Sequence, residues 1–358
     1  MIPQQPATMH SIVDIIDTSE SADDTHTSTW QQELANVIRT PQALLDALEL
    51  PKTLLNGAQA GADTFPIRVP WSFVERMKQG DPDDPLLKQV LPLSDETDPP
   101  PPGYVLDPLG EVEANAAPGI VHKYTSRVLL ITNGACAVHC RYCFRRHFPY
   151  DDNNLSVKQW QESLDYVAER PEINEVILSG GDPLSSPDSR LFKLFEMIEA
   201  IPHVTRLRIH TRLPVVIPSR VTDELVQRLT NSRLKVVMVI HANHANELDA
   251  HVATATHKLH HAGIHVLNQS VLMKGINDSV EALTELSERL FSIHVMPYYL
   301  HFLDPVVGTH HFHVELEKAQ KLHHDLHLSL PGFLVPKLIQ ELAGQGSKTP
   351  IPPLIVSK

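Results

Sequence analysis

Short apolar runs alternate with amphipathic segments of helical length over most of the chain. Between the apolar runs, a segment such as KQWQESLDYVAE places Trp160, Leu164 and Val167 at i, i+4 and i+7, which is the spacing of one helical face. The segments SRLFKLFEMIEAI and DELVQRLTNS repeat that pattern. We predict six strands, each followed by a helix. The strands are expected at Arg127–Thr132, Glu175–Gly180, Arg206–Thr211, Lys235–His241, His265–Leu272 and His294–Leu300.

This alternation predicts an α/β fold. Strands joined through helices pair in parallel with right-handed crossovers. Six units favour a partial, TIM-like (βα)6 barrel over a closed barrel of eight. A doubly wound sheet is the competing topology, because the periodicity is compatible with both.

The barrel interpretation predicts where the chemistry lies, because barrel enzymes place their sites at the C-terminal ends of the strands. The polar residues that stand out in this sequence lie at those ends and would share one rim. They are the cysteine segment after the first strand, the residues SGGD at 179–182, His210, Arg212, His241, Asn243, Gln269 and Asp304.

The first hundred residues have a different pattern. Residues 1–30 form a polar leader, and helical spacing runs from Trp30 to Leu50 with an interruption at Pro41. The stretch WSFVERMKQGDPDDPLLKQVLP predicts a further helix and a turn, and Pro99–Pro102 predicts a stiff extended joint. We therefore expect an N-terminal leader and helical region over 1–102 that covers one side of the barrel. The barrel would span 103–330, and a C-terminal segment 331–358.

Charge and composition exclude several classes of protein. The net charge is −13, and no block of Lys and Arg is available to neutralise phosphates, so no nucleic-acid partner is expected. The N-terminus lacks the basic start and apolar core of a secretory signal, and no run approaches the roughly 20 apolar residues that cross a bilayer. Three cysteines do not make a disulfide framework, so a cytoplasmic protein is expected.

The 22 histidines include pairs at i, i+4 spacing, His257 with His261 and His323 with His327. No cysteine or carboxylate grouping completes a metal site around either pair, so we expect them to be surface residues.

The three cysteines, Cys136, Cys140 and Cys143, lie in the single run CAVHCRYC. Three thiolates can hold three irons of a four-iron cluster and leave the fourth iron open to bind a small molecule. The CxxxCxxC spacing is that of radical S-adenosylmethionine (SAM) enzymes, in which the open iron takes the amino and carboxylate groups of SAM. The alternative is a structural zinc with His139 or His147 as fourth ligand, although such sites more often use paired CxxC segments.

Ser179-Gly180-Gly181-Asp182 ends the second predicted strand. Glycines there allow close approach of the backbone, whose N–H and C=O groups could hold the polar end of the methionine moiety of SAM. Alone, the motif indicates a tight strand-to-helix turn, and beside the cysteine segment it predicts a cofactor site. We expect two residues of the same rim, His241 and Gln269, to contact the cofactor as well.

Several collinear motifs together resemble the lysine 2,3-aminomutase family from about Gly103 to Thr349. They are CRYCFRRHFPY, LSGGDPL, HANHANE, LNQSVLMKGIND, MPYYLHFLD and GQGSKTP. The resemblance implies an isomerase that converts L-α-lysine to β-lysine with a 4Fe-4S cluster, SAM, pyridoxal 5′-phosphate and an external electron donor. It implies that a 5′-deoxyadenosyl radical takes a hydrogen from the β-carbon, the nitrogen migrates, and the hydrogen returns.

The resemblance is strongest to short bacterial members that make β-lysine for modification of elongation factor P. It therefore implies a functional link to that factor and its ligase. The long-tailed members carry further cysteines and bind zinc, but this sequence has no cysteine after Cys143, so no such zinc site is expected.

The resemblance also assigns roles to individual residues. It implies that Lys348 forms a Schiff base with pyridoxal phosphate, in line with an amine nucleophile in a glycine-rich segment. Lys123 and Arg127 match positions linked to that cofactor; the family commonly has arginine at the first, and lysine keeps the charge but lacks the bidentate fork.

For the substrate, the resemblance implies that Arg145 binds the carboxylate of lysine, and that Asp304 and Glu341 hold its ε-ammonium. A buried ammonium without such partners would cost several kcal/mol. Glu341 departs from the aspartate of the better-known members. The alternatives are an aminomutase for another amino acid or for a free β-lysine pathway, and a non-catalytic iron-sulfur or zinc protein.

Overall fold

The computed structural model of the chain describes residues 29–148, 155, 157–352 and 354. The polar leader predicted for residues 1–30 therefore lies almost entirely outside the described residues. Within them, no helix is long and apolar enough to cross a membrane.

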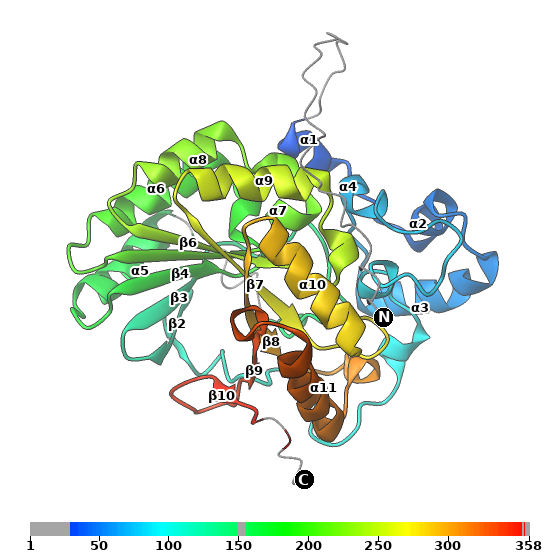
Figure 1. The fold of residues 1–358 in the computed structure, drawn as a ribbon. Coiled ribbons are helices and arrows are strands. Elements are labelled where there is room, and N and C mark those ends of the chain that lie inside the picture. Colours follow the sequence, from blue (N-terminus) through cyan, green and yellow to red (C-terminus); the bar gives the residue numbers. More distant parts are fainter. Residues whose placement is uncertain (1–28, 149–154, 156, 353, 355–358) are drawn as a thin grey trace, which may run out of the picture.

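Six parallel strands form the centre of the structure and follow one another in the order of the chain (Figure 1). They coincide with the six predicted strands to within two residues at each end. A doubly wound sheet would reverse its strand order at a switch point, so the sequential order identifies a barrel. The predicted partial barrel is confirmed. Its strands are β3 (Arg127–Ile131), β4 (Glu175–Ser179), β5 (Arg206–Thr211), β6 (Lys235–His241), β7 (His265–Val271) and β8 (Met296–His301).

Four further strands extend the sheet at its edges and were not predicted. β1 (Asn115–Ala117) and β2 (Ile120–Tyr124) add antiparallel strands before β3. After β8, β9 (Lys337–Gln340) pairs in parallel and β10 (Thr349–Pro350) pairs antiparallel with β9. β1, β9 and β10 have four residues or fewer, which is too short for a clear alternation. β2 has five residues, as β3 and β4 do, and was missed although its length is the same. β1 and β10 are the two ends of the described sheet, so the barrel is open.

Six longer helices cover the outer face of the sheet (Figure 1). Three of them begin at a side chain that accepts a hydrogen bond from the first turn, namely Thr222, Asp249 and Ser279. Such caps satisfy backbone N–H groups that have no partner inside the helix. The helices are α5 (Val157–Ala168), α6 (Asp188–Glu199), α8 (Asp223–Thr230), α9 (Ala250–His261), α10 (Val280–Ser292) and α11 (Leu316–Ser329), with the one-turn helix α7 (Leu213–Val216) after β5.

The two faces of each strand have different partners. Leu130, Leu178 and Ile209 stand side by side in register on β3, β4 and β5, and they are fully buried in the main apolar core with Trp160 of α5. Because successive side chains of a strand point to opposite faces, the alternate positions point into the barrel. There the strands carry many polar side chains around a cavity. The outer face therefore stabilises the fold, and the inner face is available for chemistry.

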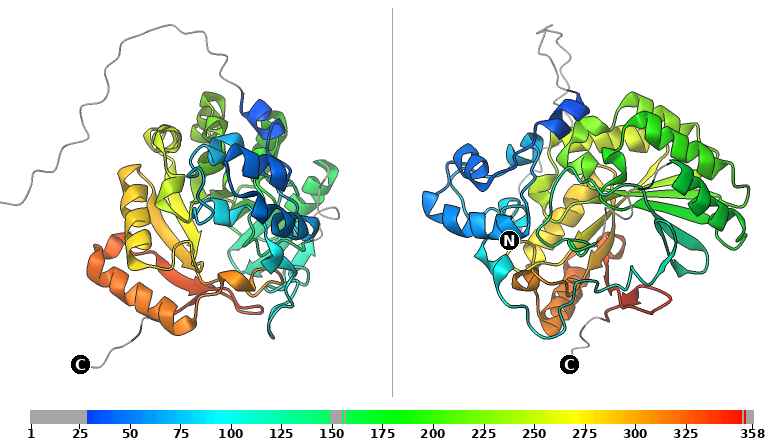
Figure 2. Two further views of the ribbon diagram at one scale, coloured as in Figure 1. Left: turned by 90° about the vertical axis from the view of Figure 1, so that its right-hand side faces the viewer. Right: turned by 180° about the vertical axis from the view of Figure 1, so that it is seen from behind.

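The N-terminal region packs against one side of the barrel, as expected (Figure 2). Its helices are α1 (Trp30–Ala35), α2 (Pro41–Ala47), α3 (Leu55–Thr64) and α4 (Trp71–Val74). Pro41 begins α2 directly after the capping residue Thr40, which explains the interruption in the pattern. α4 has four residues and is followed by turns, in line with the predicted helix and turn. The boundaries at 102 and 330 stay a prediction.

The N-terminal region and the barrel also share one apolar core. Leu44, Phe73 and Leu86 belong to the same buried cluster as the outward-facing residues of the strands. The N-terminal helices therefore pack against the barrel through apolar side chains. This packing brings the N-terminal region close to the loops at the rim of the barrel.

Candidate active site

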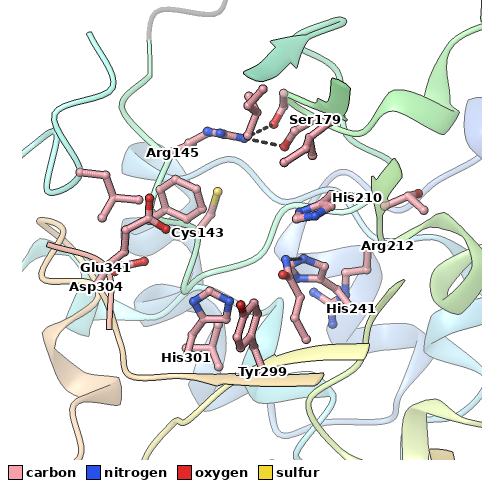
Figure 3. A pocket seen from close by; sticks show the side chains of 18 of the residues that line it. Cys143, Arg145, Ser179, His210, Arg212, His241, Tyr299, His301, Asp304 and Glu341 are labelled. Carbon is pink, nitrogen blue, oxygen red and sulfur yellow. Dashed lines mark hydrogen bonds between the residues drawn. The ribbon is translucent and has the colours of Figure 1, made fainter. Parts of the chain in front are cut away.

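The inside of the barrel holds a cavity of about 530 Å³ at the C-terminal ends of the strands. The labelled side chains in Figure 3 point toward a common space from several sides. All the predicted site residues line this cavity, and the structure thus brings together residues spread over more than 200 positions of sequence. They are Lys123, Arg127, Cys136, Cys140, Cys143, Arg145, Ser179, Gly180, Gly181, Asp182, His241, Gln269, Asp304, Glu341 and Lys348.

The cysteine loop follows β3 and turns all three thiols toward the cavity. Burial raises the pKa of the Cys136 thiol, and burial together with the neighbouring Cys140 raises the pKa of Cys143 to about 11. These thiols are therefore protonated at neutral pH until a metal displaces the protons. Three thiols on one short loop form the donor set of an iron-sulfur cluster, so Cys136, Cys140 and Cys143 fit that group.

The two histidines considered for a zinc site point elsewhere. His139 contacts the backbone oxygen of Pro66 through Nδ1 at 2.7 Å, and His147 contacts that of Val307 through Nε2 at 3.2 Å. In the described part of the chain, no three His, Cys, Asp or Glu side chains are grouped so that they could hold one metal ion. Neither histidine is therefore placed as a fourth ligand beside the three thiols.

The glycines of the SGGD motif bring the end of β4 against the cysteine loop. A Cβ at Gly181 would lie 2.3 Å from the Ala135 oxygen, and one at Gly180, where φ is +123°, would lie 2.6 Å from the Asn133 oxygen. The Gly181 N–H donates to the Asn133 oxygen at 2.9 Å, and the Asp182 N–H donates to the Ala135 oxygen at 2.8 Å. These two N–H groups and the close approach therefore join the end of β4 to the cysteine loop.

Asp182 connects the SGGD motif to the end of β5. Its carboxylate accepts hydrogen bonds from Thr211 Oγ1 and from the Arg212 backbone N–H, both at 2.6 Å. Burial raises the pKa of Asp182 to about 6, and the hydrogen bonds oppose that rise. The residue thus holds two rim loops together at the cavity wall.

Lys348 and Glu341 form a close ion pair across the C-terminal segment. Lys348 Nζ lies 2.5 Å from Glu341 Oε2, and Lys123 Nζ lies 3.5 Å from Glu341 Oε1. Burial acts to raise the pKa of Glu341, but the two ammonium groups outweigh it and hold that pKa below its usual value. The segment GQGSKTP, which has little periodicity of its own, is thereby tied to the barrel wall.

Asp304 lies beside Glu341 in Figure 3. Burial, and then repulsion by the Glu341 carboxylate, raises the pKa of Asp304 to about 7. The two acids together form an anionic wall that suits a ligand ammonium group.

Arg145 also lines the cavity and has a partner that the sequence analysis missed. Its Nε and Nη2 donate to the two carboxylate oxygens of Glu111 at 2.7 and 2.9 Å, and Nη1 donates to Ser179 Oγ at 2.9 Å. Glu111 lies in the loop before β1, where no periodicity or motif marks it.

Three histidines face the cavity in the neutral state. Burial, followed by the cations around it, lowers the pKa of His241 to about 3, and burial also lowers the pKa of His210 and His301. His241 contacts Gln269, while the Nε2 atoms of His210 and His301 are buried without a hydrogen-bond partner. Two unpartnered polar atoms at a cavity wall are what a bound polar ligand would satisfy.

A basic group lies near Lys348 on the same wall. Arg127 stacks its guanidinium 3.9 Å from the centre of the Tyr124 ring, and Lys123 donates to the Leu109 oxygen at 2.9 Å. Arg208, which we did not predict, also lines the cavity and pairs with Glu175 at 2.6 Å. Cations of this kind suit a phosphate group.

Other cavity residues carry a signal that could have identified them. Tyr299 and His301 on β8 are two positions apart and both face the cavity. A period of two with polar residues on the inner face is the sign of a functional barrel interior.

Comparison with known proteins gives consistent matches. A sequence profile of the radical SAM superfamily matches residues 130–286. L-lysine 2,3-aminomutase of Escherichia coli (strain K12) is 48% identical over 324 residues, which are 90% of this chain and 94% of that protein. The L-lysine 2,3-aminomutase of Haemophilus influenzae is 48% identical over 320 residues, 89% of this chain and 94% of that protein. That of Clostridium subterminale is 33% identical over 325 residues, 90% of this chain and 78% of that protein.

Proposed function

The chain belongs to the lysine 2,3-aminomutase family of radical SAM enzymes, and from this premise we propose that it isomerises L-α-lysine to β-lysine. In this reaction the amino group moves from carbon 2 to carbon 3 and a hydrogen atom moves the other way. The product is an isomer of the substrate, so no net oxidation or reduction occurs.

The observation that carries the proposal is the distribution of charge around the cavity. Arg145 offers a cation for a carboxylate, and Asp304 with Glu341 offers carboxylates for an ammonium group. An amino acid with a positively charged end is complementary to both groups. A neutral side chain could pair with neither acid and would lose this charge complementarity.

Membership of the radical SAM superfamily implies a 4Fe-4S cluster and SAM. We propose that Cys136, Cys140 and Cys143 hold the cluster, and that the strand ends carrying Ser179, His241 and Gln269 flank SAM. When bound, the cluster and SAM supply the radical that removes and returns the migrating hydrogen. The protein orients the substrate and excludes water, since the cavity lies inside the barrel.

We further propose that pyridoxal 5′-phosphate binds at Lys348. Support comes from the position of the Lys348 amine on the cavity wall and from the cations Lys123 and Arg127 near it, which suit the phosphate. Glu341 pairs with Lys348 in this structure.

The covalent part of this proposal can be tested without turnover. The protein would be incubated with pyridoxal phosphate, reduced with borohydride and digested for peptide mass spectrometry. We expect the label on Lys348 and its loss in Lys348→Ala. Labelling that is spread over exposed lysines, or unchanged in the variant, would contradict the assignment.

The activity itself requires an anaerobic assay. The reconstituted protein would receive SAM, pyridoxal phosphate, dithionite and isotopically labelled L-lysine, and the products would be separated by chiral chromatography. We expect β-lysine, and its loss in Cys140→Ala and Lys348→Ala. Cleavage of SAM without β-lysine would leave the radical chemistry in place and assign another substrate.

We also propose that the β-lysine supplies the modification of elongation factor P in the cytoplasm. Support comes from the resemblance to the short bacterial branch of the family. The test is deletion of the gene followed by mass spectrometry of elongation factor P. We expect the modified factor to lose the mass of one lysine residue. An unchanged mass would show that the β-lysine serves another pathway.

A further inference from the structure

The N-terminal region contacts the cysteine loop through several hydrogen bonds. The backbone N–H of His139 donates to the Arg68 oxygen, and that of Arg141 donates to the Gln89 oxygen, both at 2.9 Å. The Arg141 side chain pairs with Glu96 at 2.5 Å, and both side chains are buried. The loop that carries the thiols is therefore held from outside the barrel as well as from β3.

The same region also inserts a polar side chain beneath the loop. Gln89, which is fully buried, accepts a hydrogen bond from Arg212 Nη2 at 2.7 Å through Oε1. Its amide donates to Glu247 Oε1 at 3.0 Å. Gln89 thus joins a cation at the end of β5 to an acid in the loop after β6.

Arg212 connects this buried group to the cluster ligands. Its Nη1 donates to Cys140 Sγ at 2.7 Å, and its Nη2 also lies 3.1 Å from Glu247 Oε2. The Arg212 and Glu247 side chains are 6% and 0% exposed. In a site that excludes water, charges at these distances act on one another far more strongly than they would in solvent.

A cation beside a cysteine sulfur affects the two oxidation states of a cluster differently. The reduced cluster carries one more negative charge, so the guanidinium stabilises it more than the oxidised cluster. Hydrogen bonds to the sulfurs and net charge are among the factors that set cluster potentials. Glu247 acts in the opposite direction, because its negative charge offsets part of the field of Arg212.

We propose that Arg212, held by Gln89 and Glu247, is a positioning residue that fixes Cys140 and sets the reduction potential of the cluster. The N-terminal region is then part of the cluster site, since it supplies Gln89. This inference rests on the proposed function to the extent that it requires the cluster to be present.

A second buried pair provides a matched control. Arg141 and Glu96 also join the cysteine loop to the N-terminal region, and their side chains are 3% and 0% exposed. The hydrogen bonds of the Arg141 guanidinium go to Glu96, to the Lys88 oxygen and to His311. Glu96→Gln therefore disturbs the same junction at similar burial without removing a charge that faces the Arg212–Cys140 contact.

The test is a redox titration of the reconstituted clusters followed by electron paramagnetic resonance. We expect Arg212→Gln to lower the midpoint potential, and Glu247→Gln to raise it. Each midpoint potential should shift by about 59 mV. For a one-electron couple, a shift of that size changes the ratio of reduced to oxidised cluster about tenfold at a fixed solution potential. Because Glu96 pairs with Arg141, whose guanidinium bonds to Glu96, the Lys88 oxygen and His311 rather than to a thiol, Glu96→Gln should shift the potential by clearly less than Glu247→Gln.

Opposite shifts from the two partners separate an electrostatic role from a structural one, because loss of packing would move both variants in the same direction. If Arg212→Gln does not fold, Arg212→Lys keeps the charge without the fork and should shift the potential downward by less.

The inference would be overturned if variants with intact four-iron clusters had unchanged potentials or potentials shifted in the same direction. The proposed function would stand in that case. A wild-type protein that takes up no cluster, by iron and sulfide analysis, would overturn the proposed function together with it.

Discussion

Arg145 presents the Nε and Nη2 edge of its guanidinium to Glu111, whose carboxylate oxygens lie 2.7 and 2.9 Å from those two nitrogens. Both side chains are 6% exposed. This edge is the one with which arginine binds a carboxylate in bidentate geometry. A substrate carboxylate must therefore share Arg145 with Glu111 or displace it.

Replacing Glu111 should strengthen substrate binding. Glu111→Gln keeps an oxygen that can orient Arg145 but removes the competing negative charge. We expect the KM for lysine to fall several-fold with little change in kcat, measured by steady-state kinetics under anaerobic conditions.

The matched control for this prediction is Glu113→Gln, in the same loop but with an exposed side chain, which should leave KM unchanged. A higher KM in Glu111→Gln would show instead that the full negative charge is needed to position Arg145.

Lysine binding should weaken as the pH falls through 7. The pKa of Asp304 is raised to about 7 by burial and by the charge of Glu341, so the carboxylate becomes neutral below that pH and attracts the ε-ammonium less. Lysine affinity, measured by calorimetry on the reconstituted protein without SAM, should be lower at pH 6 than at pH 8. Asp304→Asn should bind weakly at both pH values. The other charged groups acting on Asp304 include Lys348, Glu111 and Lys123.

The same shift has a consequence for stability. An aspartate in the unfolded chain ionises near pH 4, so between about pH 4 and 7 the folded state binds more protons at Asp304 than the unfolded state does. This residue should therefore make the free energy of unfolding fall as the pH rises across that window. Chemical denaturation at several pH values should show a flatter profile for Asp304→Asn, and parallel profiles would contradict the assigned pKa.

Loss of the Glu341 charge should reduce lysine binding strongly. Removing one partner of a buried, hydrogen-bonded ion pair costs about 2–5 kcal/mol, which corresponds to an affinity loss of about 30-fold or more. We expect that loss in Glu341→Gln by calorimetry with lysine, while norleucine, which lacks the ammonium, should lose no affinity. Glu162→Gln, on the exposed face of α5, serves as the control. Equal losses for both ligands would remove Glu341 from ammonium recognition.

Gly181→Ala should separate the cysteine loop from the end of β4. The added Cβ would lie 2.3 Å from the Ala135 oxygen, which belongs to the backbone and can move only with the loop. We expect a loss of about 1–3 kcal/mol in the free energy of unfolding, by urea denaturation, together with a lower iron content after reconstitution. Gly332→Ala is the matched control, because a Cβ there meets no atom within 4 Å. Normal iron uptake in Gly181→Ala would show that the loop tolerates the displacement.

Much of the fold followed from local pattern. The six parallel strands were predicted to within two residues, because each is long enough to show its period and lies between amphipathic helices. The short edge strands, such as β10 with two residues, were missed because they gain their order from a neighbouring strand. The start of α2 at Pro41 was also visible, since proline is tolerated in the first turn of a helix but not in its interior.

The members of the site were predictable for a different reason. Parallel strands of a barrel end on the same side, so residues at the strand ends, such as His241 and Gln269, must meet once the topology is known. Lys348 could not be found in this way, because it lies in the segment between β9 and β10, whose position depends on an edge strand. Its assignment came from family resemblance.

The sequence by itself determined which residues face the inside of the barrel and which chemistry they bring, because strand period and motif spacing are local properties. Only the tertiary structure decided the partners of those residues. Gln89 meets Arg212 across 123 positions and Glu111 meets Arg145 across 34. Such pairs depend on how separate elements pack, and no local pattern records that geometry. The partners in turn set the charge, the pKa and the freedom of each group that binds a ligand.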